Sequence, residues 1–189
     1  MPHHSTPVSD WIARWTPLLR PNGRALDLAC GSGRHSIWLA NQGMGVTAVD
    51  RDVLSLVGLK AQNPAIHTAQ ADLEAQPWPL AGQTFDTVLV TNYLWRPLWP
   101  HILASLAPGG VLLYETFAHG NASVGRPSRP DFLLQPGELL RLCTGLHVVA
   151  FEDGFLPHPE RFVQRICALA TSLPGESGPP KRYFLNSAG

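Results

Sequence analysis

The sequence predicts an α/β protein built on a mostly parallel sheet that helices cover on both faces and an antiparallel hairpin closes. Short apolar stretches alternate with helical patterns from residue 24 to about residue 115, which is typical of such a sheet. The last two apolar stretches follow one another with no helical pattern between them. The chain has 189 residues, 44% of them hydrophobic and 15% charged, which suits one globular domain.

Ser9 is a candidate helix cap, because apolar residues at helical spacing follow it from Trp11 to Leu19, where Pro21-Asn22-Gly23 ends the pattern. The predicted strands are 24–29, 46–49, 65–69, 85–90, 111–115, 146–151 and 162–170. The predicted helices lie around 37–40, 54–60 and 97–106.

Two connections are unusual. The stretch from Asp72 to Phe85 contains Pro77 and Pro79 and is too broken for a full crossover helix. Asp153-Gly154 marks the expected turn of the final hairpin. We expect one domain over residues 1–171 and a loose tail, rich in proline and glycine, over residues 172–189.

Composition argues against several classes of protein. Lys+Arg and Asp+Glu both number 14, so the basic excess that is typical of nucleic-acid binding is absent. Three widely spaced cysteines indicate neither a disulfide framework nor a zinc site, and no metal is expected. No signal peptide is recognisable, and no apolar run reaches the ~20 residues that span a bilayer. We therefore expect a cytoplasmic protein without nucleic-acid or membrane partners, either a monomer or a homodimer.

The glycine-containing turn from Asp27 to Gly33 is the candidate ligand-binding loop. It follows the first strand and enters a helix, so bare backbone and free N–H groups are offered to a ligand. A nicotinamide or flavin site is the rival interpretation, but Ser36 replaces its third glycine, and Asp27 would repel a pyrophosphate. An acid in front of this loop favours a cationic ligand.

Two further acids follow later strands. Asp50 ends the second strand, where α/β proteins bind ribose hydroxyls. Asp72 follows the third strand and could accept a hydrogen bond from an adenine amino group, although aspartate also caps turns.

With these residues in place, the chain resembles the class I (Rossmann-like) S-adenosylmethionine-dependent methyltransferases over roughly residues 24–170. The motifs that carry the resemblance are 27–33, Asp50, Ala71-Asp72-Leu73, Phe85-Asp86 and Leu106-Ala107-Pro108-Gly109-Gly110. Within the family the chain is similar to compact tellurite-resistance-type methyltransferases, on the stretches 114–117, 126–134 and 136–140.

The resemblance implies a three-layer sandwich with a seven-stranded sheet, and it assigns cofactor roles by position. Asp27 and the loop residues Ala29, Gly31 and Gly33 would hold the methionine end, with Ala29 where a glycine often stands. Asp50 would take the ribose, Arg51 would lie along the adenine, and Asp72 and Leu73 would bind it. Thr91 would sit beneath the methionyl group.

The expected reaction is in-line methyl displacement onto a small-molecule acceptor, by analogy a thiol, chalcogen or other soft anion. Proximity alone can contribute roughly 7–11 kcal/mol to such a transfer, so no obligatory base is expected. The acceptor candidates follow the fourth and fifth strands and are Asn92, Arg96, Glu115, Arg126 and Arg129, with Tyr93 and His119 as catalytic candidates. The long loop 118–135 is expected to bind or cover the acceptor.

Two other functions stay open: a non-catalytic S-adenosylmethionine-binding or regulatory protein, and a nicotinamide oxidoreductase. Methylation of exocyclic base amines is disfavoured, because Thr91-Asn92-Tyr93-Leu94 lacks the prolines that such enzymes carry after the fourth strand.

Overall fold

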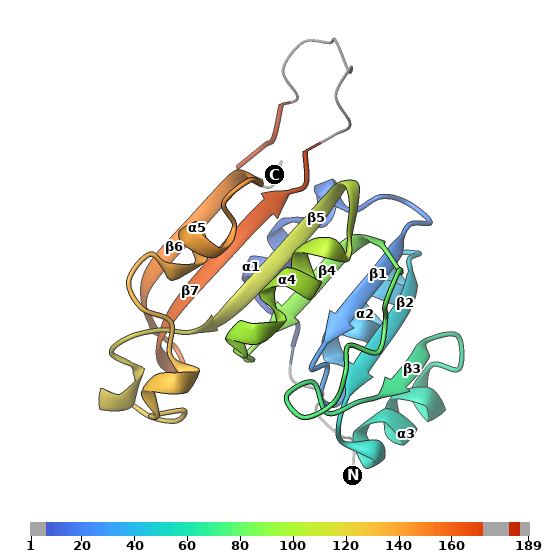
Figure 1. The fold of residues 1–189 in the computed structure, drawn as a ribbon, viewed down its shortest axis with the longest axis horizontal. Coiled ribbons are helices and arrows are strands. Elements are labelled where there is room, and N and C mark those ends of the chain that lie inside the picture. Colours follow the sequence, from blue (N-terminus) through green and yellow to red (C-terminus); the bar gives the residue numbers. More distant parts are fainter. Residues whose placement is uncertain (1–6, 172–181, 186–189) are drawn as a thin grey trace.

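A computed structural model describes residues 7–171 and 182–185, and it confirms the predicted sheet (Figure 1). Its strands are β1 (Arg24–Leu28), β2 (Gly45–Asp50), β3 (His67–Gln70), β4 (Phe85–Thr91), β5 (Leu106–Phe117), β6 (His147–Pro157) and β7 (Glu160–Leu169). They lie in the order β3-β2-β1-β4-β5-β7-β6. Strands β1 to β5 pair in parallel, whereas β7 runs antiparallel to β5 and β6.

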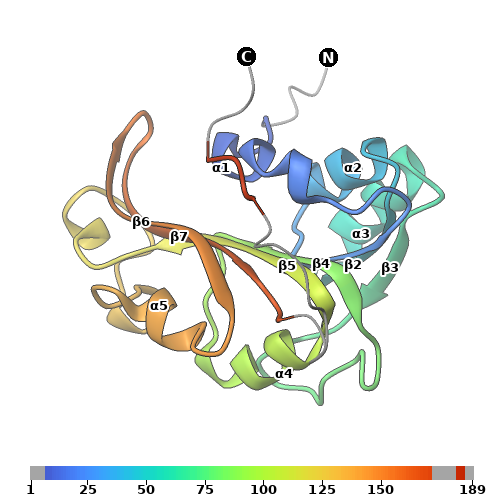
Figure 2. The same cartoon turned by 90° about the horizontal axis from the view of Figure 1, so that it is seen from above.

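Helices form a layer on each face of the sheet, as Figure 2 shows. One layer holds α1 (Asp10–Arg14), α2 (Arg34–Asn41) and α3 (Val53–Gln62); the other holds α4 (Trp99–Ala104) and α5 (Glu138–Leu142). Side chains alternate between the faces of a strand, so each face has its own core. Leu26 and Leu112 belong to the core under α4 and α5, whereas Leu89 and Leu113 belong to the core under α1 to α3. The three-layer α/β architecture is thereby confirmed.

The N-terminal helix is shorter than predicted. It ends at Arg14 and is followed by a separate 3₁₀ helix, η1 (Thr16–Leu18), because Pro17 lacks the N–H that would continue the α-helical bonds. The side chain of Ser9 does not cap α1. Its hydroxyl donates instead to Glu115, at 3.0 Å.

The predicted turn of the last hairpin was wrong. Asp153 and Gly154 lie inside β6 and pair with Gln164 and Val163, and the chain reverses only between Pro157 and Glu160. The two strands continue past the Asp-Gly pair because Phe155 and Phe162 pack together across them, with ring centroids 5.0 Å apart.

Strand β5 also differs from the prediction, because it begins at Leu106 and includes Pro108-Gly109-Gly110. The register against β4 shifts there, between Phe85 and Thr87. A Cβ on Gly110 would lie 3.0 Å from the Phe85 carbonyl oxygen, so glycine permits this close approach of the two backbones.

The remaining segments agree with the sequence in outline. No helix lies between β3 and β4, as predicted, and Trp78 from that connection stacks on His101 of α4 with ring centroids 5.4 Å apart. The predicted helix 97–106 is a 3₁₀ helix, η2 (Arg96–Leu98), followed by α4. The loop after β5 contains two further 3₁₀ helices, η3 (Asn121–Ser123) and η4 (Pro130–Phe132).

Most of the predicted loose tail lies outside the described residues. Of its described part, Leu185 accepts hydrogen bonds from Arg14 through its carbonyl, and the Tyr183 ring lies 5.3 Å from that of His147. Across residues 7–171 and 182–185, no helix has the length and apolar character to cross a membrane, and no cluster of three metal-ligand side chains occurs.

We expect Gly33→Ala to destabilise the protein more than Gly43→Ala. Both glycines have left-handed backbones, φ +79° and +81°, so each substitution costs about 1–2 kcal/mol in conformational strain. Only at Gly33 would the new Cβ meet another residue, 2.5 Å from Leu59 Cδ1 of α3, which adds roughly 1–3 kcal/mol. Urea unfolding of both variants measures the difference, and equal losses would contradict the packing role of Gly33.

Candidate active site

Three connected cavities open at the carboxyl ends of the parallel strands. The first cavity, of about 280 Å³, is lined by Ala29, Asp50, Arg51, Ala71, Asp72, Leu73, Glu74, Tyr93 and Phe132. The second cavity, of about 270 Å³, is lined by Ala29, Cys30, Gly31, Ser32, Arg34, His35, Thr91 and Asn92. The third cavity, of about 210 Å³, is lined by Glu74, Asn92, Tyr93, Leu94, Thr116, Phe117, Pro127 and Phe132. Shared residues join the first cavity to the other two.

The loop after β1 turns sharply around the first two cavities. Ala29, Gly31 and Gly33 all have left-handed backbones, so Ala29 adopts the conformation of the glycine that it replaces. Asp50 stabilises the turn, because its carboxylate accepts from the Gly31 N–H at 2.7 Å and from the Asp52 N–H at 2.9 Å. A Cβ on Gly31 would meet no atom within 4 Å, so there is open space beside this glycine, which lines the second cavity.

Asp27 lies beneath this loop and lines none of the three cavities. Its carboxyl group is 1% exposed and accepts a hydrogen bond from the Ser36 hydroxyl at 2.6 Å. Burial raises the pKa of Asp27 to about 7, although the Ser36 hydrogen bond opposes that shift. The structure therefore places this predicted cofactor residue behind the site.

Arg51, Asp72 and Leu73, the residues predicted to lie around the adenine, line the wall of the first cavity. Asp72 also forms a local turn, because it accepts from the backbone N–H groups of Glu74 and Ala75. Leu73 is buried and supplies apolar wall.

Tyr93 lies between the first and third cavities. Its hydroxyl is buried and has no hydrogen-bond partner among the described residues. Burial, and next the nearby Glu74 and Asp72 charges, raise the pKa of Tyr93 above its usual range. At neutral pH Tyr93 is therefore a hydrogen-bond donor rather than a base.

A row of polar side chains crosses the sheet beside the second cavity. Thr91 of β4 pairs with Glu115 of β5, Glu115 with Arg165 of β7, and Arg165 with Glu152 of β6. These four residues, named here the polar row, lie on the face that α1 and α2 cover. Glu115 is fully buried, and its charge is compensated by Arg161 at 3.4 Å, Arg165 at 3.5 Å and the Ser9 hydroxyl.

Next to the polar row lies a fourth cavity, of about 320 Å³, which we name the arginine cavity. It is lined by Ser9, Asp10, Trp11, Arg14, Leu156, His158, Arg161 and Arg165. The Nε atom of Arg161 is buried there without a partner among the described residues. Arg161 and Arg165 were not predicted as site residues, because Arg161 directly precedes the predicted strand 162–170. In the structure β7 begins at Glu160, so the alternation of side chains along the strand places both arginines on one face.

The other predicted acceptor residues are dispersed. Asn92 lines the second and third cavities, in a left-handed conformation with φ +54°. Arg126, Arg129 and His119 are exposed, and none of them lines the cavities described above. Arg129 pairs with Asp131, also exposed, at 3.0 Å.

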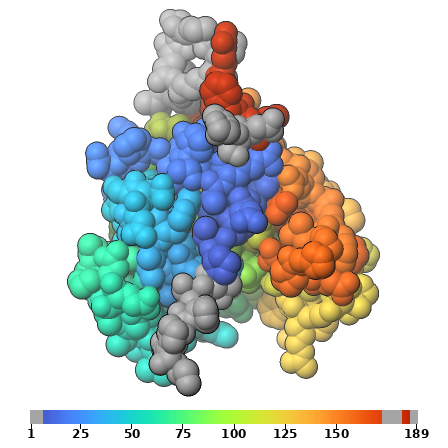
Figure 3. Space-filling view, turned by 180° about the vertical axis from the view of Figure 1, so that it is seen from behind, coloured from blue at the N-terminus to red at the C-terminus, as the bar shows by residue number. Residues whose placement is uncertain are grey.

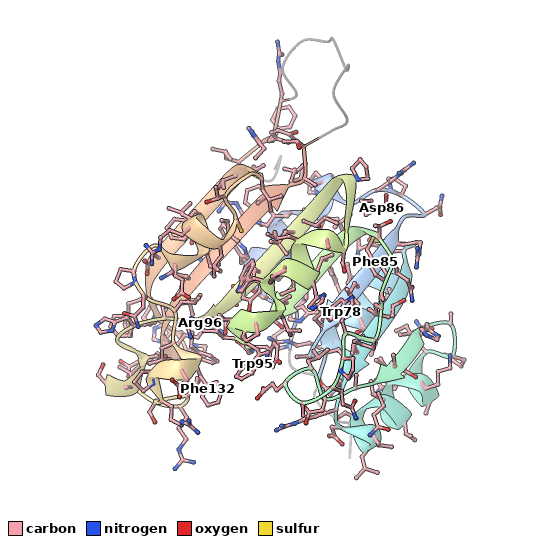
Figure 4. The ribbon with its side chains drawn as sticks, in the orientation of Figure 1. Trp78, Phe85, Asp86, Trp95, Arg96 and Phe132 are labelled. Atoms are coloured by element: carbon pink, nitrogen blue, oxygen red, sulfur yellow. The ribbon has the colours of Figure 1, made fainter. Side chains whose placement is uncertain are left out.

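The side chain of Arg96 holds the loop after β5 in place through hydrogen bonds (Figure 4). Its guanidinium donates to both carboxylate oxygens of Glu138, at 2.6 and 2.9 Å. It also donates to the carbonyls of Asp131 and Leu133, on either side of Phe132. Burial alone would raise the pKa of Glu138, but the hydrogen bonds from Arg96 and the Gln135 N–H, together with the nearby arginine charges, lower it below its ordinary value. Arg96 thus positions the Phe132 wall of the first cavity.

His35 is a buried residue of the second cavity that the sequence did not distinguish from an ordinary core histidine. Its ring lies between the backbone N–H of Ser9, 3.2 Å from Nε2, and the Thr91 hydroxyl, 3.2 Å from Nδ1. Burial, and next the charge of Arg34, lower the pKa of His35 to about 3, so the ring is neutral under ordinary conditions.

We expect Asp27→Asn to gain stability relative to the wild type as pH rises from about 4 to 7, because the buried Asp27 of the wild type must then ionise. The lowered pKa of His35 acts in the opposite direction in both proteins, so the comparison of the two isolates Asp27. The folded Asp27 keeps a proton up to a pKa of about 7, whereas the unfolded chain releases it near 3.8. Each pKa unit corresponds to ~1.4 kcal/mol, so the contribution is roughly 4 kcal/mol at most. Urea unfolding between pH 4.5 and 8 measures the trend, with the exposed Asp131→Asn as control. Parallel curves for the wild type and Asp27→Asn would contradict the raised pKa.

Comparisons with known proteins find methyltransferases. Residues 25–110 match the methyltransferase domain family, and the match includes the glycine loop, Asp50 and Asp72. The trans-aconitate 2-methyltransferase of Sinorhizobium medicae is 28% identical over 177 residues, which are 86% of this chain and 62% of that protein. The malonyl-[acyl-carrier protein] O-methyltransferase of Enterobacter lignolyticus is 36% identical over 106 residues, which are 50% of this chain and 39% of that protein. The chain therefore spans less than two thirds of the length of these curated relatives.

Solved structures agree in fold. TehB from Haemophilus influenzae superimposes with a TM-score of 0.75 at 20% identity, over 89% of this chain and 64% of that one. The family match ends at residue 110, before Glu115 and the residues of the loop and hairpin. The match over residues 25–110 and the fold together confirm the resemblance in the sequence to the class I methyltransferases, a family whose cofactor is S-adenosylmethionine.

Proposed function

We propose that the protein transfers the methyl group of S-adenosylmethionine to a small-molecule acceptor by in-line displacement. The observation that carries this proposal is the junction of the first and second cavities at Ala29, on the loop that Asp50 braces. The first cavity would hold the adenosine, with Asp50 at the ribose and with Arg51, Asp72 and Leu73 around the adenine. The second would hold the methionine end, against Gly31 and above Thr91.

The residues present fit this cofactor. The open space beside Gly31 admits a ligand against bare backbone, and Tyr93, whose buried hydroxyl has no hydrogen-bond partner among the described residues, lines the first cavity. Asp27 would act on the cationic methionine end through its charge from beneath the loop, since no cavity reaches its carboxylate. A bound cation would lower the pKa of Asp27 and release part of its proton.

We expect titration calorimetry to detect binding of S-adenosylmethionine and S-adenosylhomocysteine, but not of NADH. Asp50→Ala should raise the Kd of both sulfur compounds by about tenfold or more, since it removes a charged hydrogen-bond acceptor. Asp50→Asn is the matched variant, because its amide oxygen can still accept from Gly31 and so preserve the loop. The exposed Asp131→Ala should bind like the wild type. A folded wild-type protein that binds neither sulfur compound would refute the proposal.

For the acceptor we propose a small anion that is already ionised at neutral pH, such as a thiolate, a chalcogen oxyanion or a carboxylate. Support comes from Arg34, which lines the second cavity, and from Arg161 in the arginine cavity, whose Nε has no partner among the described residues although the same guanidinium pairs with Glu115. Such an acceptor needs no general base, in keeping with the exposed position of His119 and the raised pKa of Tyr93. The substrate named for the trans-aconitate relative is consistent with a carboxylate.

We expect Arg161→Met to raise KM for anionic acceptors by about tenfold or more while leaving affinity for S-adenosylhomocysteine near that of the wild type. Arg20→Ala is the control, because Arg20 is exposed and pairs with Asp86 away from these cavities. Turnover on a panel of thiols, oxyanions and carboxylates gives the KM values. A rise in KM for Arg126→Ala rather than Arg161→Met would support the acceptor site predicted from sequence.

The same panel separates an enzyme from a non-catalytic cofactor-binding protein, which would bind S-adenosylhomocysteine and turn over nothing. The cytoplasmic location, the absence of nucleic-acid partners and the choice between monomer and homodimer stay predictions.

A further inference from the structure

The hydrogen-bond partners of His35 determine where its ring proton lies. The Ser9 backbone N–H can only donate, so Nε2 of His35 must accept and carries no hydrogen. A neutral ring then has its proton on Nδ1, and Nδ1 donates to the Thr91 hydroxyl oxygen. The Thr91 hydrogen cannot point back to Nδ1 and is free to be donated elsewhere.

The second cavity is the space open to that hydrogen, because both Thr91 and His35 line it. Residues 7–9, which we name the N-terminal strap, hold the arrangement from the other side. The strap is fixed by Arg34, which donates to the Pro7 carbonyl at 3.3 Å, and by the hydrogen bond from Ser9 to buried Glu115. Figure 3 shows the blue N-terminal segment on this face, between α2 and the orange β6–β7 hairpin.

We propose that His35 is a positioning residue, which makes the Thr91 hydroxyl a hydrogen-bond donor toward the cofactor's amino-acid carboxylate. The inference rests on the proposed binding of the methionine end in the second cavity. His35 acts through Thr91 and need not touch the cofactor. The strap contributes by supplying the N–H that keeps the proton off Nε2.

Two ligands distinguish this role from a general effect on folding. S-adenosylhomocysteine carries the amino-acid carboxylate, whereas 5′-methylthioadenosine shares the adenosine and lacks it. His35→Gln keeps an acceptor near the Nε2 position and loses the donor to Thr91. His35→Asn can place an amide N–H near the Nδ1 position and restore that donor. Thr91→Val removes the hydroxyl itself.

We expect His35→Gln and Thr91→Val each to raise the Kd of S-adenosylhomocysteine about tenfold, with methylthioadenosine changed less than about twofold. His35→Asn should bind closer to the wild type, and the His35→Gln/Thr91→Val double variant should be no worse than either single one. Ser9→Pro, which suits φ −60° and removes the N–H, should weaken S-adenosylhomocysteine more than Ser9→Ala.

Equal losses for both ligands in His35→Gln, or additive losses in the double variant, would overturn the positioning role. Nitrogen NMR of the wild-type ring tests it without any substitution: a proton on Nδ1 is expected, and one on Nε2 overturns the inference. If the wild type binds neither nucleoside, the proposed function itself has failed. Binding of both by the wild type without the expected pattern refutes the His35 role alone.

Discussion

The buried carboxylate of Glu115 is the constraint around which one side of the molecule is organised. A charge inside a sheet must be compensated, because burial without partners costs several kcal/mol. Here the compensation comes from β7, through Arg161 and Arg165, and from the N-terminal strap, through Ser9. The same carboxylate therefore joins three segments that are far apart in sequence and brings them beside the second cavity.

A second carboxylate performs a similar task at the loop after β1. Asp50 holds the Gly31 N–H and so fixes three left-handed backbones in a short stretch. Such conformations cost free energy, and a defined loop shape is gained in return. The loop after β1 and the end of β2 are thus held together at the edge of the site.

The sheet and part of the candidate site could be predicted from the sequence. The buried strands are continuous apolar runs, and the acids at their ends follow from the alternation of strand and helix, so the sheet and the first cavity were predictable. The hairpin turn was not, because aromatic pairing of Phe155 with Phe162 across the strands outweighs the local turn preference of Asp153-Gly154. Arg96 was predicted as an acceptor residue and Arg161 was not predicted at all, because the partner of a charged side chain depends on tertiary contacts. Arg96, for example, pairs with Glu138, 42 residues away in the chain. Asp27 was expected at the surface of the site and lies beneath it, since which atoms a loop covers is decided by packing of α2 on β1.

The anchoring of the loop after β5 bears on how such a protein can diversify. Arg96 and Glu138 hold its second half, and the Asn121 side chain holds its first half through Phe162 and Pro127. Within the exposed stretch between these anchors, Arg129 lies over the Phe132 ring, 5.2 Å from its centroid, whereas the neighbouring Ser128 can change without removing that contact. Substitutions in that stretch could therefore change which acceptors reach the pocket, while the residues around the first cavity stay the same.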